Sequence, residues 1–517
     1  MIVTQTGRIG SGDRVRTSLI IAFLTALAGF FRFYRLHTVP LGLYHDEGMN
    51  GNDAITALRT GVWHVFYPAN NGREGLFINL QAISISWFGP TPRALRATSA
   101  LMGVLAVLGL FMLVRDLYDV RGPGSSGKSA IHSKWPRYAI VAGILHSVLI
   151  WPVVTSRLGL RAQMSSAAIV WTLWAFLRLY NCNWIHTRSS RFQWSATAGV
   201  LLGLGLNSYI AFRVAPLIIF GIIVMAFAAK QEHVLSSTAI LASFAAIITA
   251  PLTLYLIRHP VYISSHADQV SVFGQHQVVL GIGYNIWMEL QMCFWQGDMN
   301  WRHNFGGAPM LPWILQPFFV IGVVLIIRKL VRTGHDGVHS HWRELVILLW
   351  FVIGSLPNIL AESHSQPHGL RLLLIAPAIT VVAAFGLVRA FDSLSRMFKL
   401  TSRWSIAGIA TVLMALTGYE YDLLFNQFAL SAGMHTAYSY PQYQLAKRLD
   451  STTSSRKRYV ISPLGDTTAY GIPILAQGIA YLTHTLSPAE QDARNIHYAI
   501  AGRIPASDSV ELIPIPW

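Results

Sequence analysis

The sequence has few charged residues and few cysteines. Only 12% of its 517 residues are Asp, Glu, Lys or Arg, and 53% are hydrophobic, whereas about a quarter of the residues of an average soluble protein are charged. This composition excludes an ordinary soluble protein and indicates an integral membrane protein. The two cysteines, Cys182 and Cys293, are predicted to lie on opposite sides of the membrane, so we expect no disulfide between them and no metal or redox chemistry.

Acidic residues are the scarcer charge. Thirty-nine Lys and Arg against 23 Asp and Glu give a net charge of +16, which suggests an anionic partner. Nucleic acid is one candidate, but the basic residues are spread over many short loops instead of one domain. An anionic lipid or a lipid phosphate fits this spread better, and we expect no nucleic acid partner.

A cleavable signal peptide is also lacking. The first apolar run, SLIIAFLTALAGFFRFYRL, is too long for one and no small-residue cleavage site follows it, so it is predicted to stay as a first span in the plasma membrane. With roughly 20 residues per span, the sequence predicts eleven transmembrane helices. The predicted ranges are 18–36, 94–114, 138–155, 163–180, 194–211, 214–229, 234–257, 312–327, 344–361, 372–388 and 404–420.

The distribution of Lys and Arg predicts the orientation. With a cytoplasmic N-terminus, the basic loops at 115–137, 178–193, 328–343 and 389–403 are all cytoplasmic, as the positive-inside rule requires. Two further apolar stretches, 74–88 in the first outer loop and 276–295, are predicted to be helices that lie in the membrane interface. If either one spanned the membrane, the basic loops after it would move to the outer side.

The chain is predicted to have two domains. Residues 1–420 form the multi-span membrane domain, and residues 421–517 form a small extracytoplasmic α/β domain, since PQYQLAKRLD is helix-like and RKRYVISPL strand-like. Outside this tail, every basic residue on the predicted outer face is Arg and none is Lys. Arginine binds phosphate with two parallel hydrogen bonds and keeps its charge. A few of these arginines could instead only cap helices or reach the interface, namely Arg32, Arg35, Arg93 and Arg96.

Two adjacent carboxylates, Asp46 and Glu47, follow the first span directly in the stretch YHDEGMN. They open a predicted short helix that ends at Gly61. Asp46 can be the N-cap of this helix, or it can accept a proton from a substrate hydroxyl at the membrane surface; the sequence leaves both open. Glu74, after a turn rich in Asn and Gly, can be a helix-start acid or a second functional acid.

Other polar clusters also fall on the predicted outer side. SRLGLRAQ is predicted to place Arg157 and Arg161 one helical turn apart. His364 and His368 with Glu362 could suggest a metal site, but no tight ligand spacing is present, and surface histidines are the preferred interpretation. The remaining candidates lie in QGDMNWRHNFGGAPML and AESHSQPHGLR, and they are Asp298, Asn300, Arg302, His303 and Arg371.

One motif on the predicted inner side is a decoy. GPGSSGKS at 122–129 matches the phosphate-loop pattern of nucleotide-binding proteins. That pattern works only between a buried strand and a helix of an α/β domain, and here it occupies a short loop between two predicted spans. We interpret it as a flexible basic loop.

At this point the sequence resembles a known group. YHDEGMNGNDAITALRTG, the Asn-Gly-Arg-Glu stretch and FGPTPRALRATSALMGVLAVLGLFMLVRDLY together resemble the polytopic glycosyltransferases of the GT-C fold. Among these they are similar to glycosyltransferase family 39, which includes protein O-mannosyltransferases and the lipid A aminoarabinose transferase. The resemblance is strongest over residues 18–215, extends to about 390 and is absent from the tail. It implies extracytoplasmic transfer of a sugar from a polyprenyl-phosphate donor to an acceptor hydroxyl of a lipid, polysaccharide or protein, with inversion.

The resemblance also implies roles for residues. Asp46 matches the catalytic general base, with Glu47 beside it, Glu74 matches a second acid, and Arg157 and Arg161 match a stretch near the donor. Arg371 is our choice for the lipid phosphate on its chemistry. The predicted substrate-binding set is His45, Arg73, Arg157, Arg161, Asp298, Arg302, His303, His368 and Arg371.

The sequence leaves alternatives open for the cofactor and for the class of protein. No cofactor or metal is predicted, because the family resemblance argues for none, although other GT-C enzymes use a divalent cation near such acids and that question stays open. A flippase or transporter of polyprenyl-linked sugars is the alternative function, yet no convincing internal repeat is present. A non-catalytic lipid-sugar binding protein, in which Asp46 is only a helix cap, is the third possibility.

Overall fold

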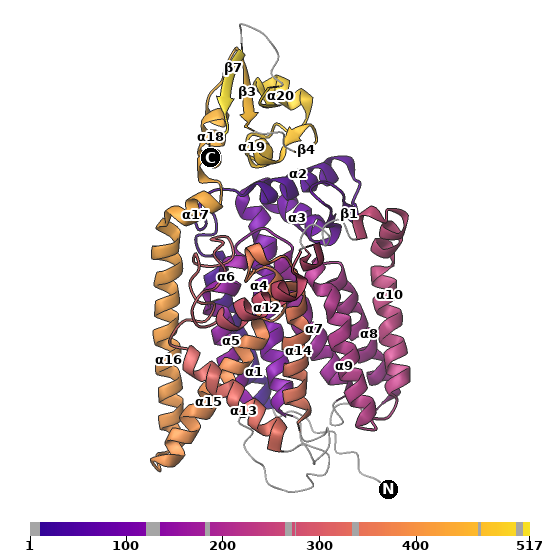
Figure 1. Cartoon of the computed structure of the whole chain (residues 1–517), viewed down its shortest axis with the longest axis vertical. Coiled ribbons are helices and arrows are strands. Elements are labelled where there is room, and N and C mark those ends of the chain that lie inside the picture. The colour runs from indigo at the N-terminus through magenta and orange to yellow at the C-terminus, as the bar shows by residue number, and fades with distance from the viewer. Residues whose placement is uncertain are drawn as a thin grey trace.

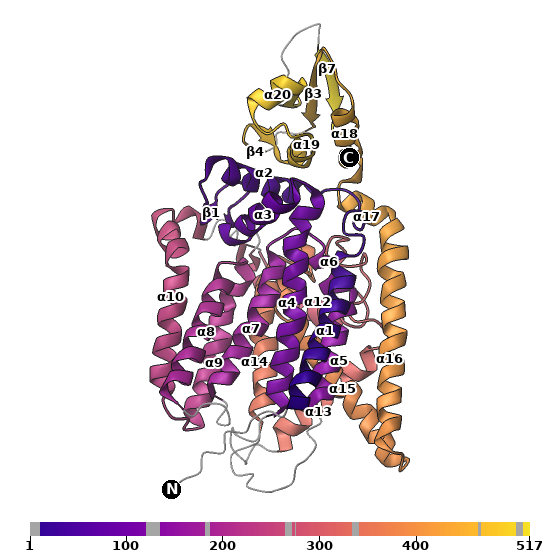
Figure 2. The same ribbon diagram turned by 180° about the vertical axis from the view of Figure 1, so that it is seen from behind.

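The computed structural model describes a helical bundle with a small α/β domain at one end (Figures 1 and 2). The described residues are 11–119, 135–180, 187–263, 271–274, 276–332, 341–463, 467–502 and 510–516. The phosphate-loop look-alike at 122–129 and Cys182 lie outside them. Cys293 is buried and free.

Each of the eleven predicted spans coincides with a helix of the bundle, and the third is bent. In both ribbon views α10 and α16 lie at opposite edges of the bundle (Figures 1 and 2). The bundle helices are α1 (Ser11–Phe33), α4 (Pro92–Asp119), α5 (Trp135–Val148), α6 (Ile150–Ser156), α7 (Ala162–Tyr180), α8 (Arg188–Leu206), α9 (Ala215–Ala228), α10 (Val234–Arg258), α13 (Gln316–Arg332), α14 (Trp342–Ile359), α15 (Ala376–Met397) and α16 (Ser402–Asp422).

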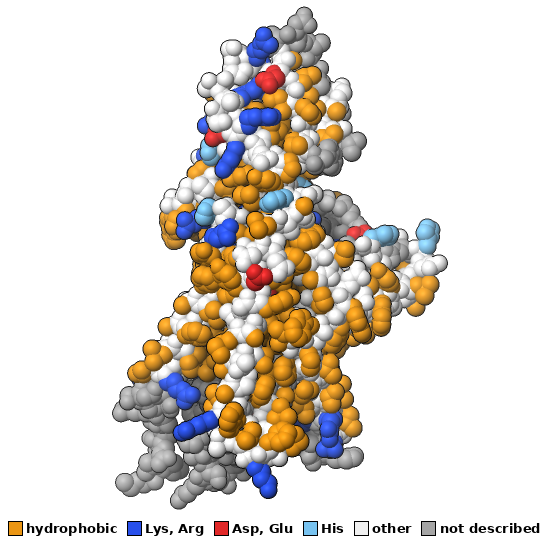
Figure 3. Space-filling model, turned by 90° about the vertical axis from the view of Figure 1, so that its left-hand side faces the viewer, with side chains coloured by type: hydrophobic (Ala, Val, Ile, Leu, Met, Phe, Trp, Pro, Cys, Tyr) orange, Lys and Arg blue, Asp and Glu red, His pale blue; other side chains and the backbone are white. Residues whose placement is uncertain are grey.

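Fewer of these helices are long and apolar enough to cross a bilayer by themselves. Among the described residues six meet that requirement, or seven if α5 and α6, which are bent by 57° at their break, form one span. The set does not include α7, α8, α13 and α16, so their crossing of the membrane stays a prediction. Apolar side chains cover the flank of the bundle, and Lys and Arg side chains gather at its lower end and on the upper domain (Figure 3).

The break between α5 and α6 is stabilised by two buried charged side chains. Arg32 on α1, which is fully buried, donates hydrogen bonds to the carbonyls of His146 and Ser147, both at 3.0 Å. Glu420 on α16 accepts a hydrogen bond from the Ile150 amide at 3.1 Å. A broken helix leaves backbone groups without partners, and these side chains supply them. Of the two predicted uses of Arg32, capping a helix and reaching the interface, the first is therefore confirmed, because Arg32 caps the carbonyl end of α5.

Short elements cover the end of the bundle that carries the α/β domain. Helix α3, with 14 residues, is shorter than the roughly 20 that a span needs, and it exposes Ile83, Trp87 and Phe88, as an interfacial helix would. Helix α2 ends at Gly61, which has a φ of 71°, as predicted. The elements here are α2 (His45–Thr60), β1 (Phe66–Tyr67), β2 (Arg73–Glu74), α3 (Gly75–Phe88), η1 (Ile210–Val214), η2 (Val272–Gly274), α12 (Val278–Gln291), η4 (Ser363–Ser365) and η5 (Arg371–Leu374).

The C-terminal domain is α/β, as predicted. Three of its strands form a parallel sheet in the order β6-β3-β7, and β4 and β5 form a short antiparallel pair. The domain has a separate core that includes Leu445, Val460 and Ile496. The main core of the bundle extends to Tyr438, and the boundary near 420 stays a prediction. The elements are η6 (Leu423–Phe428), α17 (Ala432–Ala437), α18 (Tyr440–Ser451), β3 (Lys457–Ser462), β4 (Thr468–Ala469), β5 (Ile472–Pro473), η7 (Ile474–Ala476), α19 (Gln477–Thr483), α20 (Pro488–Arg494), β6 (Ile496–Ile500) and β7 (Val510–Pro514).

The domain is docked on α2. A Cβ atom on Gly48 would lie 2.5 Å from the Cα of Gly478, so the two backbones approach closely because residue 48 has no side chain. Asn52 donates a hydrogen bond to the Gln477 side chain at 2.8 Å. The helix that begins with the two predicted acids is therefore held between the bundle and the domain.

Candidate functional site

The predicted site residues lie on five segments at the domain end of the bundle. We call this region the mouth. Its segments are the start of α2, the turn and strand at 70–74, the loop at 157–161, the loop at 296–303 and the segment at 364–371. Figure 1 shows α2, α3 and β1 directly below the C-terminal domain, with α6 and α12 in the half of the bundle nearer to it.

Asp46 lies in the first turn of α2 and keeps an accessible carboxylate. The N-cap of the helix is Tyr44, so the N-cap interpretation of Asp46 is wrong. Its Oδ1 accepts a hydrogen bond from Asn70 at 3.0 Å and lies 3.7 Å from Nε2 of His45, and 29% of its side chain is exposed. Asp46 is thus held in place and still reachable by a substrate.

Glu47 is fully buried and fully engaged. The Nε and Nη2 of Arg96 donate to its two oxygens at 2.8 and 2.9 Å, and the amide of Gly159 adds a hydrogen bond at 2.9 Å. Arg96 is fully buried as well and also donates to backbone carbonyls at 40–42, so it does not merely reach the interface. The Gly159 contact joins the segment between α1 and α4 to the loop between α6 and α7.

Arg157 and Arg161 are not one helical turn apart, because α6 ends at Ser156 and the chain runs irregularly to α7. The break brings Gly159 against Glu47, where a Cβ atom would lie only 3.1 Å from the carboxylate. Arg157 is buried and donates to the backbone carbonyls of Phe31 and Val39 at 2.7 and 2.9 Å. Its guanidinium therefore holds the end of the first span, and its predicted contact with the donor stays a prediction.

Glu74 and Arg161 form an ion pair in the mouth. The Nε of Arg161 lies 2.8 Å from Glu74 Oε2, and Arg213 approaches the other oxygen at 3.4 Å. The Arg161 guanidinium also lies over the Tyr209 ring, 5.5 Å from its centroid. Burial raises the pKa of Tyr209, and the positive charges of Arg371 and Arg161 oppose this rise.

Arg73 is joined to the C-terminal domain through Asp53. Its Nη2 lies 2.5 Å from Asp53 Oδ2, and its Nη1 donates to Asn50 at 2.6 Å. The Tyr470 hydroxyl, from the domain, donates to the other oxygen of Asp53 at 2.6 Å. Through these contacts Arg73 and Asp53 hold the segment between α1 and α4 against the C-terminal domain.

Arg302 reaches across to the start of α2. Its guanidinium lies 3.9 Å from the centroid of the Tyr44 ring, and its Nε donates to the Asn300 side chain at 3.1 Å. Burial raises the pKa of Tyr44 to about 12, the negative charge of Asp46 adds to this, and the charge of Arg302 opposes it. Arg302 and Asp46 therefore flank the same tyrosine.

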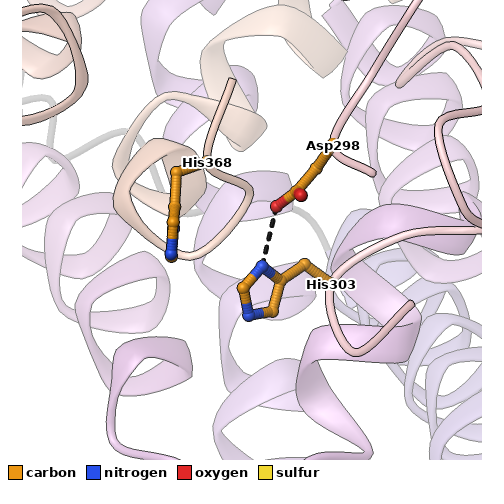
Figure 4. A group of neighbouring side chains, drawn as sticks. All are labelled: Asp298, His303 and His368. Carbon is orange, nitrogen blue, oxygen red and sulfur yellow. Dashed lines mark hydrogen bonds and ion pairs between the residues drawn. The ribbon is translucent and has the colours of Figure 1, made fainter. Parts of the chain in front are cut away.

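Asp298, His303 and His368 form a cluster in which two loops meet (Figure 4). Asp298 Oδ2 lies 2.7 Å from Nδ1 of His303 and accepts a hydrogen bond from the Gly369 amide at 2.6 Å. Burial opposes the charged form of Asp298, but the charge and hydrogen bond of His303 outweigh it and lower the pKa. Burial, with the charges of His303 and Arg371, lowers the pKa of His368 well below its ordinary value.

Arg371 is a buried residue of the predicted set with a guanidinium nitrogen that is unpaired within the described part of the chain. Its side chain is 9% exposed, and Nη1 is buried without a hydrogen-bond partner among the described residues. A buried donor without a partner is rare in proteins and requires an explanation. The guanidinium is therefore available to an anion that comes from outside the chain.

Five residues of the site were not among the predicted ones. Asn70 had a sequence signal, because Asn-Asn-Gly is typical of a tight turn; Asn70 and Asn71 adopt positive φ angles of 52° and 63°, which Asn tolerates. Asp53, Tyr209 and Tyr470 had none, since their partners lie far away in the sequence. The contact of Tyr44 with Arg302 is equally distant. The five are Tyr44, Asp53, Asn70, Tyr209 and Tyr470.

Solved structures of other proteins have a similar fold. No family model matches the sequence, and no curated protein matches it by sequence. Among solved structures, ArnT from Cupriavidus metallidurans bound to undecaprenyl phosphate matches with a TM-score of 0.54 and 12% identity, over 94% of this chain and 90% of that one.

A second match is a longer protein. The archaeal oligosaccharyltransferase AglB from Archaeoglobus fulgidus, in complex with an inhibitory peptide and a dolichol-phosphate, has a TM-score of 0.56 and 14% identity, over 93% of this chain and 65% of that one. This chain therefore spans about two thirds of that protein. At such identities the matches show the fold alone. The chain is a multi-span membrane protein with the GT-C fold that its sequence predicts.

Proposed function

We propose that the chain is a membrane glycosyltransferase that transfers a sugar from a polyprenyl-phosphate donor to an acceptor hydroxyl, with inversion at the sugar carbon. The observation that carries this proposal is the buried guanidinium of Arg371, whose Nη1 has no partner among the described residues. The protein with a matching fold is bound to undecaprenyl phosphate, and a lipid phosphate is an anion that could occupy this position.

Two further arginines could bind a phosphate together with Arg371. The positive charges of Arg161 and Arg371 both oppose the rise in the pKa of Tyr209, and those of Arg371 and Arg302 both help to lower the pKa of His368. Fixed guanidinium groups stabilise the negative charge that develops on a leaving phosphate, and they do so without giving up a proton. We assign the donor phosphate to Arg371 and Arg161, with Arg302 at the edge toward α2.

Asp46 is the proposed general base. Its exposed carboxylate takes the proton from the acceptor hydroxyl while the acceptor oxygen bonds to the sugar carbon. The bond between that carbon and the phosphate oxygen breaks, and its electron pair leaves with the polyprenyl phosphate. A leaving group that is already a phosphate needs no separate general acid.

The other predicted residues divide into three groups. Glu47, Arg73 and Arg157 are proposed as positioning residues, because their polar atoms contact other parts of the chain in the structure. Glu74 is proposed to orient Arg161 toward the donor. His45, Asp298, His303 and His368 stay predictions as substrate-binding residues.

The topology completes the proposal. We propose that α7, α8, α13 and α16 also cross the bilayer, giving eleven spans with the bend at α5 and α6 counted once. The basic loops then face the cytoplasm together with the N-terminus, and the mouth and the C-terminal domain face the outer side. The donor reaches the mouth from the bilayer and the acceptor reaches it from the aqueous phase.

The test uses membranes that contain the wild type or Asp46→Asn, supplied with labelled polyprenyl-phosphate hexoses and a cell-envelope acceptor fraction. We expect the wild type to release polyprenyl phosphate and Asp46→Asn to do so about a hundredfold to ten-thousandfold more slowly. Glu362→Gln, which changes a carboxylate outside the proposed machinery, is the control. Equal rates in the wild type and Asp46→Asn contradict the role of Asp46, and movement of the sugar lipid between leaflets without release supports a flippase instead.

A further inference from the structure

Three metal-ligating side chains from distant parts of the sequence meet at one point of the mouth. Asp298 and His303 lie in the loop between α12 and α13, and His368 lies between α14 and η5. One nitrogen or oxygen atom from each lies within 4.8 Å of those of the other two, and the two imidazole rings are 4.8 Å apart at their centroids. Figure 4 shows the carboxylate and both rings facing one another.

The cluster is held rigidly by the backbone around it. Asp298 Oδ1 accepts a hydrogen bond from the Asn300 amide at 2.8 Å, and the His368 amide donates to the Asn358 side chain at 3.1 Å. A Cβ atom on Gly369 would lie 2.9 Å from the Cβ of His303 and 3.1 Å from Oδ2 of Asp298. The two loops therefore come this close only because residue 369 is glycine.

One nitrogen of this cluster has no partner within the described chain. Nδ1 of His368 is buried and makes no hydrogen bond there. A buried polar atom of this kind usually contacts an ordered water or an ion. Two imidazoles and one carboxylate are the ligands of catalytic zinc sites, which leave the fourth position open, whereas magnesium and calcium prefer oxygen ligands alone.

We propose that Asp298, His303 and His368 bind one divalent transition-metal cation of the zinc class. The cation replaces the proton that Nδ1 of His303 now shares with Asp298 Oδ2, and this proton leaves to solvent. The spacing of the three residues, 298, 303 and 368, matches no short metal motif, and the His364–His368 pair that the sequence suggests is not the one that the fold assembles.

The surroundings indicate what occupies the fourth position. Arg302 precedes one histidine ligand and Arg371 follows the other by three residues, and their charges repel a bare cation. An anionic ligand on the metal, such as a phosphate oxygen, relieves this repulsion. This part rests on the proposed function; the binding of the metal does not.

The experiment measures metal content and spectra instead of sugar transfer. The full chain, purified in detergent with a tag that contains no histidine, is stripped with a chelator and titrated with Zn²⁺ or Co²⁺. We expect one equivalent to bind, a cobalt spectrum typical of a site with nitrogen and oxygen ligands, and a rise in the thermal midpoint with Zn²⁺. Inorganic phosphate should tighten the binding.

Matched variants make the result specific. His303→Ala and His368→Ala should lose the bound metal, and His364→Ala, which changes an exposed histidine four residues from His368, should keep it. Each variant is compared at an unchanged metal-free thermal midpoint, and Asp298→Asn serves where an alanine variant unfolds. The proposal is overturned if the wild type binds no Zn²⁺ or Co²⁺, or if His303→Ala and His368→Ala bind as the wild type does. A chain that binds zinc and transfers no sugar keeps this inference and overturns the proposed function.

Discussion

The adjacent carboxylates of Glu47 and Asp46 lie in two neighbouring regions that differ in burial and in hydrogen bonding. In the Glu47 pocket, formed by Glu47, Arg96 and Gly159, the carboxylate is fully buried and bound by a guanidinium and a backbone amide. In the Asp46 region of the mouth, the carboxylate has one hydrogen bond from Asn70 and an exposed face. The pocket joins two loops, and the exposed acid beside it is left with the capacity to bind a substrate or a proton.

The difference shows that a polar residue near a membrane surface is not functional merely because it is charged. Burial of a charge is costly unless it is paired, and Glu47 and Arg96 are paired with each other. Asp46 keeps a partly exposed side chain, and Arg371 keeps a nitrogen without a partner among the described residues. We therefore look for function where the partners of a fixed polar group are incomplete.

The largest effect on stability should come from Glu47→Gln. It leaves Arg96 buried without its countercharge, which costs about 3–5 kcal/mol, so the thermal midpoint in detergent should fall sharply and the yield with it. Asp46→Asn is the matched control, because it changes the adjacent residue and should leave the midpoint nearly unchanged. Equal losses of stability in both variants would remove the distinction between the two regions.

The second largest effect is expected on the KM for the donor, which should depend on the arginines of the mouth and not on those of the surface. Arg371→Gln should raise the KM for the polyprenyl-phosphate donor about ten- to a hundredfold, since a charge-assisted hydrogen bond contributes about 1.5–3 kcal/mol. Arg93→Gln, at an exposed arginine, should leave KM unchanged. Steady-state kinetics at varied donor concentration measure both. An unchanged KM for Arg371→Gln would place the phosphate elsewhere.

A smaller effect should follow from loosening the C-terminal domain. Tyr470→Phe removes the hydrogen bond to Asp53 and should destabilise the docking by about 1 kcal/mol, because the ring is partly exposed. Hydrogen exchange of α2 amides should become faster, while Tyr284→Phe, an exposed tyrosine on α12, should not change it. Unchanged exchange in Tyr470→Phe would show that the domain is held by its other contacts.

The smallest effect is expected at the surface pair Arg59–Glu490, which joins α2 to α20 at 2.6 Å. Exposed pairs contribute about 0.2–1 kcal/mol. Burial opposes the charged form of Glu490, but the hydrogen bonds from Arg59 and Ser487 together with the charge of Arg59 outweigh it and lower the pKa to about 2. The stabilisation is therefore present above the unfolded pKa of about 4 and is lost as the pH falls toward 2.

Arg59→Ala tests this window. The variant should lie slightly below the wild type in thermal midpoint at neutral pH, and the difference should shrink as the pH falls from about 4 toward 2. High salt should shrink it as well. A difference that persists at low pH and high salt would mean that Arg59 acts through packing and not through its charge.

The sequence by itself determined the membrane character, the positions of the bundle helices, the α/β character of the tail and the gathering of arginines and acids at one end. These features follow from hydrophobic runs, periodicity and local turn residues, which act over a few neighbouring positions. The position of Asp46 after the first span belongs to the same class. The end of α2 at Gly61 could be predicted for the same reason.

Only the tertiary structure decided which of these polar residues are paired with other parts of the chain and which keep polar atoms free for a ligand. Glu47 and Arg96 are separated by 49 residues, Asp53 and Tyr470 by 417, and Asp298 and His368 by 70, so no local pattern pairs them. After the break at Ser156, Arg157 and Arg161 have different partners, and Glu47 accepts a hydrogen bond from the amide of Gly159 between them. The partners of a buried polar side chain depend on how distant segments pack. An exposed polar group can hydrogen-bond to water, whereas a buried one must find its partner in the protein.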